Sequence, residues 1–95
     1  MKPQLTLYTR KDCCLCDDMK EIIGHVAARM PLHLTEIDVD SAPELRELFG
    51  SEVPVLCIGG RKAFKYSVTE RDLQRRLSRQ YRFPARLARK ALGRQ

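Results

Sequence analysis

Three of the four cysteines lie within four positions, as Cys13, Cys14 and Cys16, while Cys57 stands alone. A disulfide scaffold distributes its cysteines along the chain to join distant segments, and this sequence does not. Clustered cysteines indicate either thiol redox chemistry or metal binding. On a helix, the spacing of Cys13 and Cys16 places the second thiol about one turn after the first and on the same side.

That spacing suits dithiol chemistry if the pair opens a helix. A thiol at a helix N-terminus faces unpaired backbone N–H groups and the positive end of the helix dipole, and both stabilise a thiolate. Such sites lower a cysteine pKa from about 8.5 to about 3.5–7.5. Cys16 could then attack a mixed disulfide formed at Cys13 and release the reduced substrate.

The elements around the cysteines predict this placement. Residues 5–8 alternate apolar and polar side chains and are rich in β-formers, which is typical of a strand. From Cys14 onward apolar residues recur at helical steps, and Pro31 is expected to close that helix. The expected apolar stripe consists of Leu15, Met19, Ile22, Ile23, Val26 and Met30. The cysteine cluster therefore lies at a predicted strand-to-helix junction.

The middle of the chain predicts a second strand and a second helix. Residues 32–39 read as a strand, which pairs in parallel with the first through a right-handed crossover. The sequence Ser41-Ala42-Pro43-Glu44 predicts a capping box with proline just inside the helix start. Gly50 is expected to end this short helix.

The second half predicts a hairpin followed by a third helix. Residues 55–58 are continuously apolar, which favours a strand buried on both faces. Gly59-Gly60 is a hairpin turn signal, and residues 62–66 form the return strand. Ser67 or Thr69 can cap the third helix, which Phe83-Pro84 ends.

The resulting order β-α-β-α-β-β-α predicts an α/β fold. A four-stranded mixed sheet in the order 2-1-3-4, with helices on both faces, satisfies the handedness rule with short connections. The length of 95 residues allows one domain. We assign residues 1–82 to that domain and residues 83–95 to a basic C-terminal tail.

The charge is strongly asymmetric. Residues 1–72 contain ten basic and twelve acidic side chains, whereas residues 73–95 contain eight basic and no acidic ones. The basic segment is either a solvated helix face with a frayed end or an electrostatic dock for an acidic partner, nucleic acid or anionic membrane. Its cations are Arg75, Arg76, Arg79, Arg82, Arg86, Arg89, Lys90 and Arg94.

The sequence favours a cytoplasmic protein without a membrane span. No apolar run approaches the roughly 20 residues that cross a bilayer. The opening Met1-Lys2-Pro3-Gln4-Leu5 does not resemble a secretory signal. We therefore expect a reducing compartment, where structural disulfides are rare. We also expect a monomer.

These residues together resemble the glutaredoxin family of the thioredoxin superfamily. The resemblance rests on a Leu7-Tyr8 strand, a turn with Arg10, the pair Cys13–Cys16 and a later Val53-Pro54. The segment from Cys13 to Asp17 is similar to the Cys-x-Leu-Cys-Asp motif of small bacterial glutaredoxin-like proteins. The match covers roughly residues 5–80 and leaves the tail outside.

The resemblance implies a thioredoxin-like fold and a role for each matching residue. Cys13 would attack a protein or small-molecule disulfide, and Cys16 would resolve the mixed disulfide. Pro54 would be the cis-proline that faces the pair, and Val53 would offer backbone groups to the substrate. Arg10 matches the basic residue that helps to hold a glutathione carboxylate. No tightly bound cofactor is implied, and glutathione is a possible co-substrate.

Two departures concern glutathione. Glu52 replaces the usual threonine before Val53, and a carboxylate there is expected to repel an acidic tripeptide. The family's second Gly-Gly, which binds the other end of glutathione, is replaced in the segment Phe64-Lys65-Tyr66-Ser67. The resemblance therefore implies the fold and the thiol chemistry but does not extend to glutathione dependence.

Other functions remain open at this point. The chain could be a thioredoxin-fold adaptor whose basic tail docks an acidic partner. It could instead hold a metal through Cys13, Cys14 and Cys16, although structural zinc requires four ligands. We predict no metal site, because only Cys57 and the distant His25 and His33 could complete one. Cys57 is expected to pack as a small hydrophobe, Cys14 has no assigned role, and both histidines are expected to be solvated.

Overall fold

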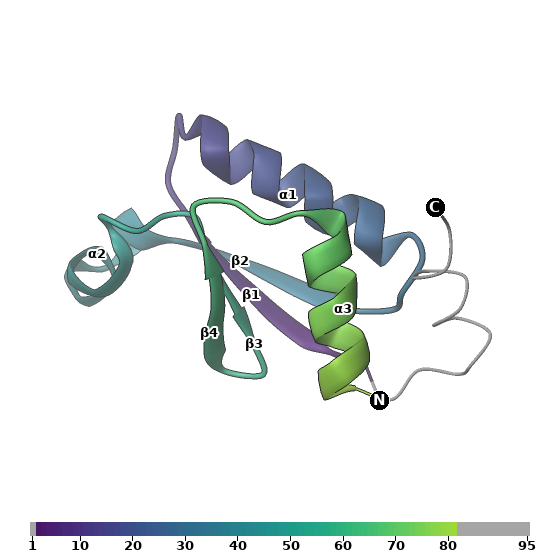
Figure 1. Cartoon of the computed structure of the whole chain (residues 1–95). Helices are drawn as coiled ribbons and strands as arrows, with labels where there is room; N and C mark the ends of the chain where they lie inside the picture. The colour runs from purple at the N-terminus through teal and green to yellow at the C-terminus, as the bar shows by residue number, and fades with distance from the viewer. Residues whose placement is uncertain (1, 82–95) are drawn as a thin grey trace.

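The computed structural model describes residues 2–81, and Figure 1 shows the arrangement of its elements. The predicted tail of residues 83–95 and the domain boundary at residue 82 lie outside the described residues. The third helix already ends at Gln80, before the break predicted at Phe83-Pro84, because Tyr81 has extended backbone. In chain order the elements are β1 (Gln4–Thr9), α1 (Cys14–Ala27), β2 (His33–Asp38), the 3₁₀ turn η1 (Val39–Ser41), α2 (Pro43–Phe49), β3 (Val55–Ile58), β4 (Arg61–Lys65) and α3 (Glu70–Gln80).

The sheet confirms the predicted α/β topology. Its strand order is β2-β1-β3-β4. β1 pairs in parallel with β2, because α1 crosses over between them, and β3 pairs antiparallel with both β1 and β4. The order places β1 and β3 in the centre of the sheet, and the residues that follow β1 and precede β3 form the candidate site.

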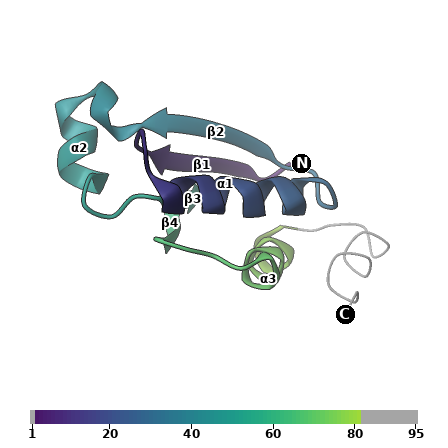
Figure 2. The same ribbon diagram turned by 90° about the horizontal axis from the view of Figure 1, so that it is seen from above.

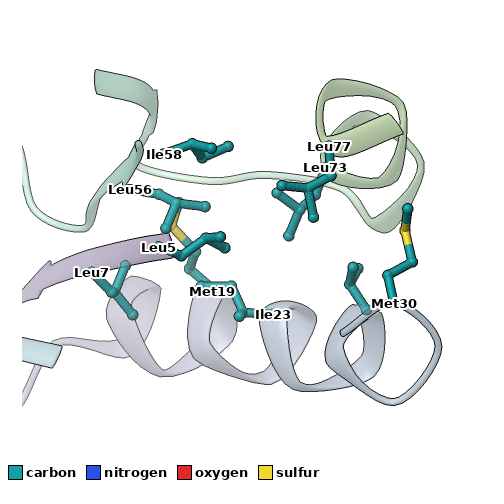
Figure 3. Close-up of a cluster of buried hydrophobic side chains, with 10 residues drawn as sticks. Leu5, Leu7, Met19, Ile23, Met30, Leu56, Ile58, Leu73 and Leu77 are labelled. Carbon is teal, nitrogen blue, oxygen red and sulfur yellow. The ribbon is translucent and has the colours of Figure 1, made fainter. Parts of the chain in front are cut away.

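α1 and α3 pack against each other and against one face of the sheet (Figure 2). β1 sends Leu5 and Leu7 to this face, and the core between the layers is closed on the helical side by residues such as Ile23 and Leu77 (Figure 3). The opposite face carries Tyr8, whose ring stacks on Phe49 of α2 with ring centres 4.1 Å apart. Helices therefore contribute to both faces, as predicted.

α1 begins at Cys14 but ends earlier than Pro31. Its last residue is Ala27, and the N–H of Arg29 donates to the carbonyl of Val26 in a tighter turn. The residue before a proline disfavours helical backbone, so Met30 leaves the helix while its side chain stays buried. The predicted stripe is wrong at Leu15, which is 48% exposed, because the first turn directs Cys16 inward instead.

The predicted capping box of α2 is wrong. The N-cap is Ala42, which makes no side-chain cap hydrogen bond. Ser41 belongs to the turn η1, and its hydroxyl donates to the carbonyl of Asp38 at 2.6 Å. The Ser41 hydroxyl is therefore used within the preceding turn and not at the start of α2. At that helix start only Pro43 acts as expected.

The hairpin and the third helix follow their predicted signals closely. Gly59 and Gly60 have φ angles of 60° and 85°, which a tight two-residue hairpin requires and glycine adopts without steric cost. Of the two candidate caps for α3, Thr69 is used, and its hydroxyl accepts from the N–H of Asp72 at 3.1 Å. The short loop between β4 and α3 starts at Tyr66, which has a φ of 72°.

Candidate active site

Cys13 occupies the N-cap of α1, as the sequence predicts. Its backbone is extended, with φ −113° and ψ 104°, and helical geometry starts at Cys14. The Sγ atom of Cys13 accepts a hydrogen bond from the N–H of Cys16 at 3.1 Å. This sulfur therefore lies at the positive end of the helix dipole and uses one of the backbone donors that the first turn leaves unpaired.

Cys13 and Cys16 form a disulfide across the first turn, with Cα atoms 5.2 Å apart. That separation lies within the ordinary range for bonded cysteines. The two sulfurs differ in accessibility, because Cys13 is half-buried and Cys16 is only 2% exposed. A thiol from outside can therefore approach Cys13 but not Cys16.

The other two cysteines are free and lie in opposite environments. Cys14 is exposed on the first turn of α1. Cys57 is buried in β3 opposite Thr6, and burial raises the pKa of its thiol. The packing of Cys57 as a small hydrophobe agrees with the prediction, and its environment disfavours the thiolate form.

Val53 and Pro54 lie at the same end of the sheet as the disulfide. Pro54 directly precedes β3, whose first residue Val55 pairs with Tyr8 near the end of β1. The Val53–Pro54 peptide bond is cis, and Pro54 is buried. Its carbonyl accepts from the N–H of Tyr66 at 2.8 Å, which holds the end of β4 against this loop.

Arg10 is occupied by partners within the protein. Nε and Nη2 donate to the two carboxylate oxygens of Asp40 at 3.0 and 3.2 Å, and Nη1 donates to the carbonyl of Gly50 at 3.1 Å. The hydrogen bond raises the pKa of Arg10 and lowers the pKa of Asp40. A side chain at position 50 would clash with the carbonyl of Arg46. Glycine at this position therefore allows Arg10 to contact the end of α2. Arg10 therefore links the loop after β1 to the turn η1 before α2 and to Gly50 at the end of α2.

A cavity of about 210 Å³ lies between this loop and the start of α1, with Cys16 in its wall. The basic side chains of Arg10, Lys11 and Lys20 line it. Its acidic lining residues are Asp12, Asp17 and Asp38. Because the charges of the lining balance, the cavity does not select strongly for an anion.

Glu52 is paired with two lysines. Its carboxylate contacts Nζ of Lys62 at 2.7 Å and Nζ of Lys65 at 3.4 Å, and these hydrogen bonds lower its pKa. The expectation that Glu52 repels glutathione assumes that its carboxylate is an isolated charge. With its two partners the group carries a net positive charge, so that electrostatic argument no longer holds.

Two residues of this region escape prediction from sequence. Asp40 lies thirty positions from Arg10, and no local pattern relates them. Tyr66 is 44% exposed beside Pro54, in a left-handed backbone conformation that glycine usually adopts. Neither residue carries a motif, and both enter the site through the folding of distant segments.

Within residues 2–81, no group of three or more histidine, cysteine or acidic side chains is placed to hold a metal ion. The two histidines differ, because the Nδ1 atom of His25 lies 3.0 Å from the carboxylate of Glu70, whereas His33 is exposed on β2.

Over the same described residues, no helix is long and apolar enough to span a bilayer.

Comparison with known proteins places these features in a family. A family model described as "Glutaredoxin-like domain (DUF836)" matches residues 4–78. An uncharacterized protein of Mycobacterium tuberculosis is 31% identical over 83 residues, which span 82% of this chain and 86% of the relative.

Solved structures agree with this match. The structural genomics target XcR50 from X. campestris superposes with a TM-score of 0.69 and 29% identity, over 79% of this chain and 96% of that one. A mutant thioredoxin from Halobacterium salinarum superposes with a TM-score of 0.60 and 21% identity, over 87% of this chain and 79% of that one. The fold is therefore thioredoxin-like.

Proposed function

This chain belongs to the glutaredoxin-like domain family, and we propose that it is a thiol–disulfide oxidoreductase in which Cys13 and Cys16 cycle between dithiol and disulfide. The observation that carries the proposal is the disulfide between an accessible Cys13 at a helix N-cap and a buried Cys16. This arrangement separates an attacking from a resolving sulfur.

In the proposed reaction, the Cys13 thiolate attacks one sulfur of a substrate disulfide. The substrate S–S bond breaks, a mixed disulfide forms at Cys13, and the first substrate thiolate leaves and takes a proton. The Cys16 thiolate then attacks the Cys13 sulfur and releases the second substrate thiolate. The two cysteines lose two electrons and become the disulfide seen in the structure, and an external dithiol or two monothiols return those electrons.

Cys13 is suited to the attacking role by its local backbone. In the reduced protein, the N–H of Cys16 and the dipole of α1 stabilise negative charge at the Cys13 sulfur. A lower pKa increases the thiolate fraction at neutral pH and also makes this sulfur a better leaving group. Cys16 is buried and acts only after the mixed disulfide has formed at Cys13. It therefore needs no lowered pKa before that step.

We assign substrate positioning to Val53, Pro54 and Arg10. A substrate chain lying across the loop before β3 would meet the backbone of Val53, beside the buried Pro54. A guanidinium has five N–H donors, and Asp40 and Gly50 accept from three of those of Arg10. The remaining donors are the ones proposed to contact a substrate carboxylate.

Glutathione is a proposed co-substrate, alongside thioredoxin-type dithiols. The neutralised Glu52 supports this inclusion, because the group with Lys62 and Lys65 no longer opposes an acidic tripeptide. The reduction potential of the Cys13–Cys16 pair, equilibrated with each reductant, discriminates between the two. A value of about −200 to −230 mV is typical of glutaredoxins and one of about −270 mV of thioredoxin.

Single-cysteine variants test the proposed roles. Cys13→Ser is expected to reduce the turnover of a dithiol-coupled disulfide reductase assay to the uncatalysed background, because the attacking sulfur is lost. Cys16→Ser is expected to trap a mixed disulfide at Cys13, which mass spectrometry of the intact protein detects.

Cys14→Ser is the matched control, since it removes a neighbouring thiol that the mechanism does not use. Its turnover should stay within about twofold of the wild type. Full activity in Cys13→Ser, or a mixed disulfide that forms at Cys14 rather than at Cys13, would overturn the proposed assignment.

A further inference from the structure

We propose that the outer edge of β4, together with the facing part of α3, docks an extended acidic segment of a partner protein. This surface, the β4–α3 groove, consists of Arg61, Lys62, Phe64, Arg76 and Arg79. It is separate from the disulfide, and its binding does not require redox activity.

β4 is an edge strand. Within the described sheet it pairs only with β3, so the backbone N–H and C=O groups on its outer side have no strand partner. Such an edge is a template on which an extended peptide can add as a further strand. The exposed side chains Arg61, Lys62 and Lys65 make the edge positive.

Two hollows follow this edge. One of about 370 Å³ lies between β4 and the second half of α3, and Arg61, Arg76 and Arg79 line it. The other, of about 210 Å³, extends from Lys62 to Lys65. Lys62 lines both hollows, so together they follow β4 along its length.

The arginines of the groove lack acidic partners. In the part of the chain that the structure describes, no carboxylate forms a salt bridge with Arg61, Arg76 or Arg79. Arg76 instead lies over the ring of Phe64, at 5.2 Å from its centre. Arg76 and Arg79 are three residues apart and therefore neighbours on the helix surface. Their guanidinium groups are suited to bidentate pairing with carboxylates.

The register of β4 predicts how the acids are spaced. Arg61 pairs with Ile58 and faces α3, whereas Lys62 pairs with Cys57 and extends to the other side, where it shares the carboxylate of Glu52 with Lys65. The register shifts between Leu56 and Cys57, so Ala63 interrupts the alternation within β4, but the side chains of an added strand itself alternate between these two sides. We therefore expect acidic residues at every second position, directed toward α3, with uncharged residues between them.

A peptide fits this surface better than a nucleic acid. Binding of single-stranded nucleic acid relies on exposed aromatic rings that stack on bases. Phe64, the ring in this groove, is half-buried and covered by Arg76. The free strand edge instead offers the donors and acceptors that match a peptide backbone.

The groove leads toward the candidate active site. β4 ends at Lys65, and the next residue, Tyr66, donates its N–H to the carbonyl of Pro54. A segment docked along β4 therefore has one end beside the loop that precedes β3.

Fluorescence anisotropy with a labelled peptide that alternates glutamate and valine tests the proposal at low salt. The full chain is expected to bind this peptide and not its glutamine counterpart. Arg76→Glu with Arg79→Glu should weaken binding about tenfold or more, as should Arg61→Glu alone. Lys2→Glu with Arg29→Glu is the matched control, because it makes the same change in net charge on exposed residues elsewhere.

N-methylated peptides separate strand addition from simple charge attraction. Methylating alternate residues blocks one edge of the peptide, so one of the two alternate sets should abolish binding and the other should retain it. Equal binding of both sets, equal affinity in the control and groove variants, or no binding of the acidic peptide would overturn the proposal. Tighter binding of an oligothymidylate would replace it with a general polyanion surface.

Discussion

At the scale of single residues, neighbouring cysteines acquire different chemistry from their local backbone. Cys13 caps a helix, Cys14 points to solvent one residue later, and Cys16 is buried one turn on. Cys57 lies in a central strand, where burial raises the pKa of its thiol. Identical side chains thus become an accessible and a buried partner of one disulfide, an exposed free thiol and a buried free thiol.

The two free cysteines should therefore differ in alkylation rate. In the oxidised protein at mildly alkaline pH, iodoacetamide is expected to label Cys14 rapidly and Cys57 slowly. A raised pKa leaves less thiolate at Cys57 at any given pH, and burial limits access of the reagent. Peptide mass spectrometry over time measures both rates.

Cys14→Ser is the control, because it should remove the rapid phase and leave the slow one. Denaturant should then make the remaining cysteine react quickly. Equal rates for Cys14 and Cys57 in the native protein would contradict the assigned environments.

At the scale of elements, the ion pair of Arg10 and Asp40 holds the loop after β1 to the segment before α2. Arg10 also reaches the carbonyl of Gly50, so it contacts the chain on both sides of α2. α2 has no buried residue of its own, and its Phe49 packs on Tyr8. Short helices with so little buried surface depend on such links for their position.

Replacing Asp40 by asparagine is expected to lower the thermal midpoint slightly at neutral pH. Because Arg10 lowers the pKa of Asp40 in the folded state, this stabilisation is present above the ordinary aspartate pKa of about 3.9 and is lost as the pH falls through the lower folded value. The difference between variant and wild type should therefore shrink under acidic conditions.

Glu47→Gln removes an exposed carboxylate of α2 and serves as the comparison. It should show a smaller change in midpoint at neutral pH. A difference between Asp40→Asn and the wild type that stays constant down to strongly acidic pH would contradict the proposed role of the ion pair.

At the scale of the whole molecule, one core holds the sheet, α1 and α3 together (Figure 3). The same packing sets the start of α1 and the loop before β3 at one end of the sheet. A chain of 95 residues has a stability of about 5–14 kcal/mol by the usual proportion per residue. Loss of one large core side chain therefore removes a substantial part of it.

Leu77→Ala should reduce the free energy of unfolding by about 2–5 kcal/mol, because Leu77 is fully buried between α3 and the sheet. Chemical denaturation monitored by circular dichroism measures this change. Leu48→Ala on the exposed side of α2 is the control and should change it by about 0.5 kcal/mol or less, since Leu48 is 64% exposed. Similar losses in the two variants would contradict the location of the core.

Local patterns predicted most of the architecture. Strand alternation, the helical stripe after Cys14 and the turn at Gly59-Gly60 each act over a few residues, and together they specify the order and pairing of the elements. The placement of Cys13 at a helix start is local in the same way. It depends only on where the spacing of apolar residues changes from every second residue, as in a strand, to about every 3.6 residues, as in a helix.

Errors of prediction arose where the chain around an element takes a form that the local pattern does not show. The hydroxyl of Ser41 was expected to cap α2, but it bonds the carbonyl of Asp38, because the chain forms a 3₁₀ turn there. Leu15 fits the helical period but lies at the first turn, where Cys16 takes the buried position. The spacing of apolar residues defines which face of a helix is buried. It does not define how far along the helix the adjoining sheet extends.

The sequence by itself determined the order of the elements and the helix N-terminal position of Cys13, since these follow from neighbouring residues, and the handedness rule then gave the strand order and the fold class. Only the tertiary structure decided which charges meet: Arg10 with Asp40, and Glu52 with Lys62 and Lys65. Coulomb interactions depend on distance in space, and segments ten to thirty residues apart come within a few ångströms only when the sheet assembles.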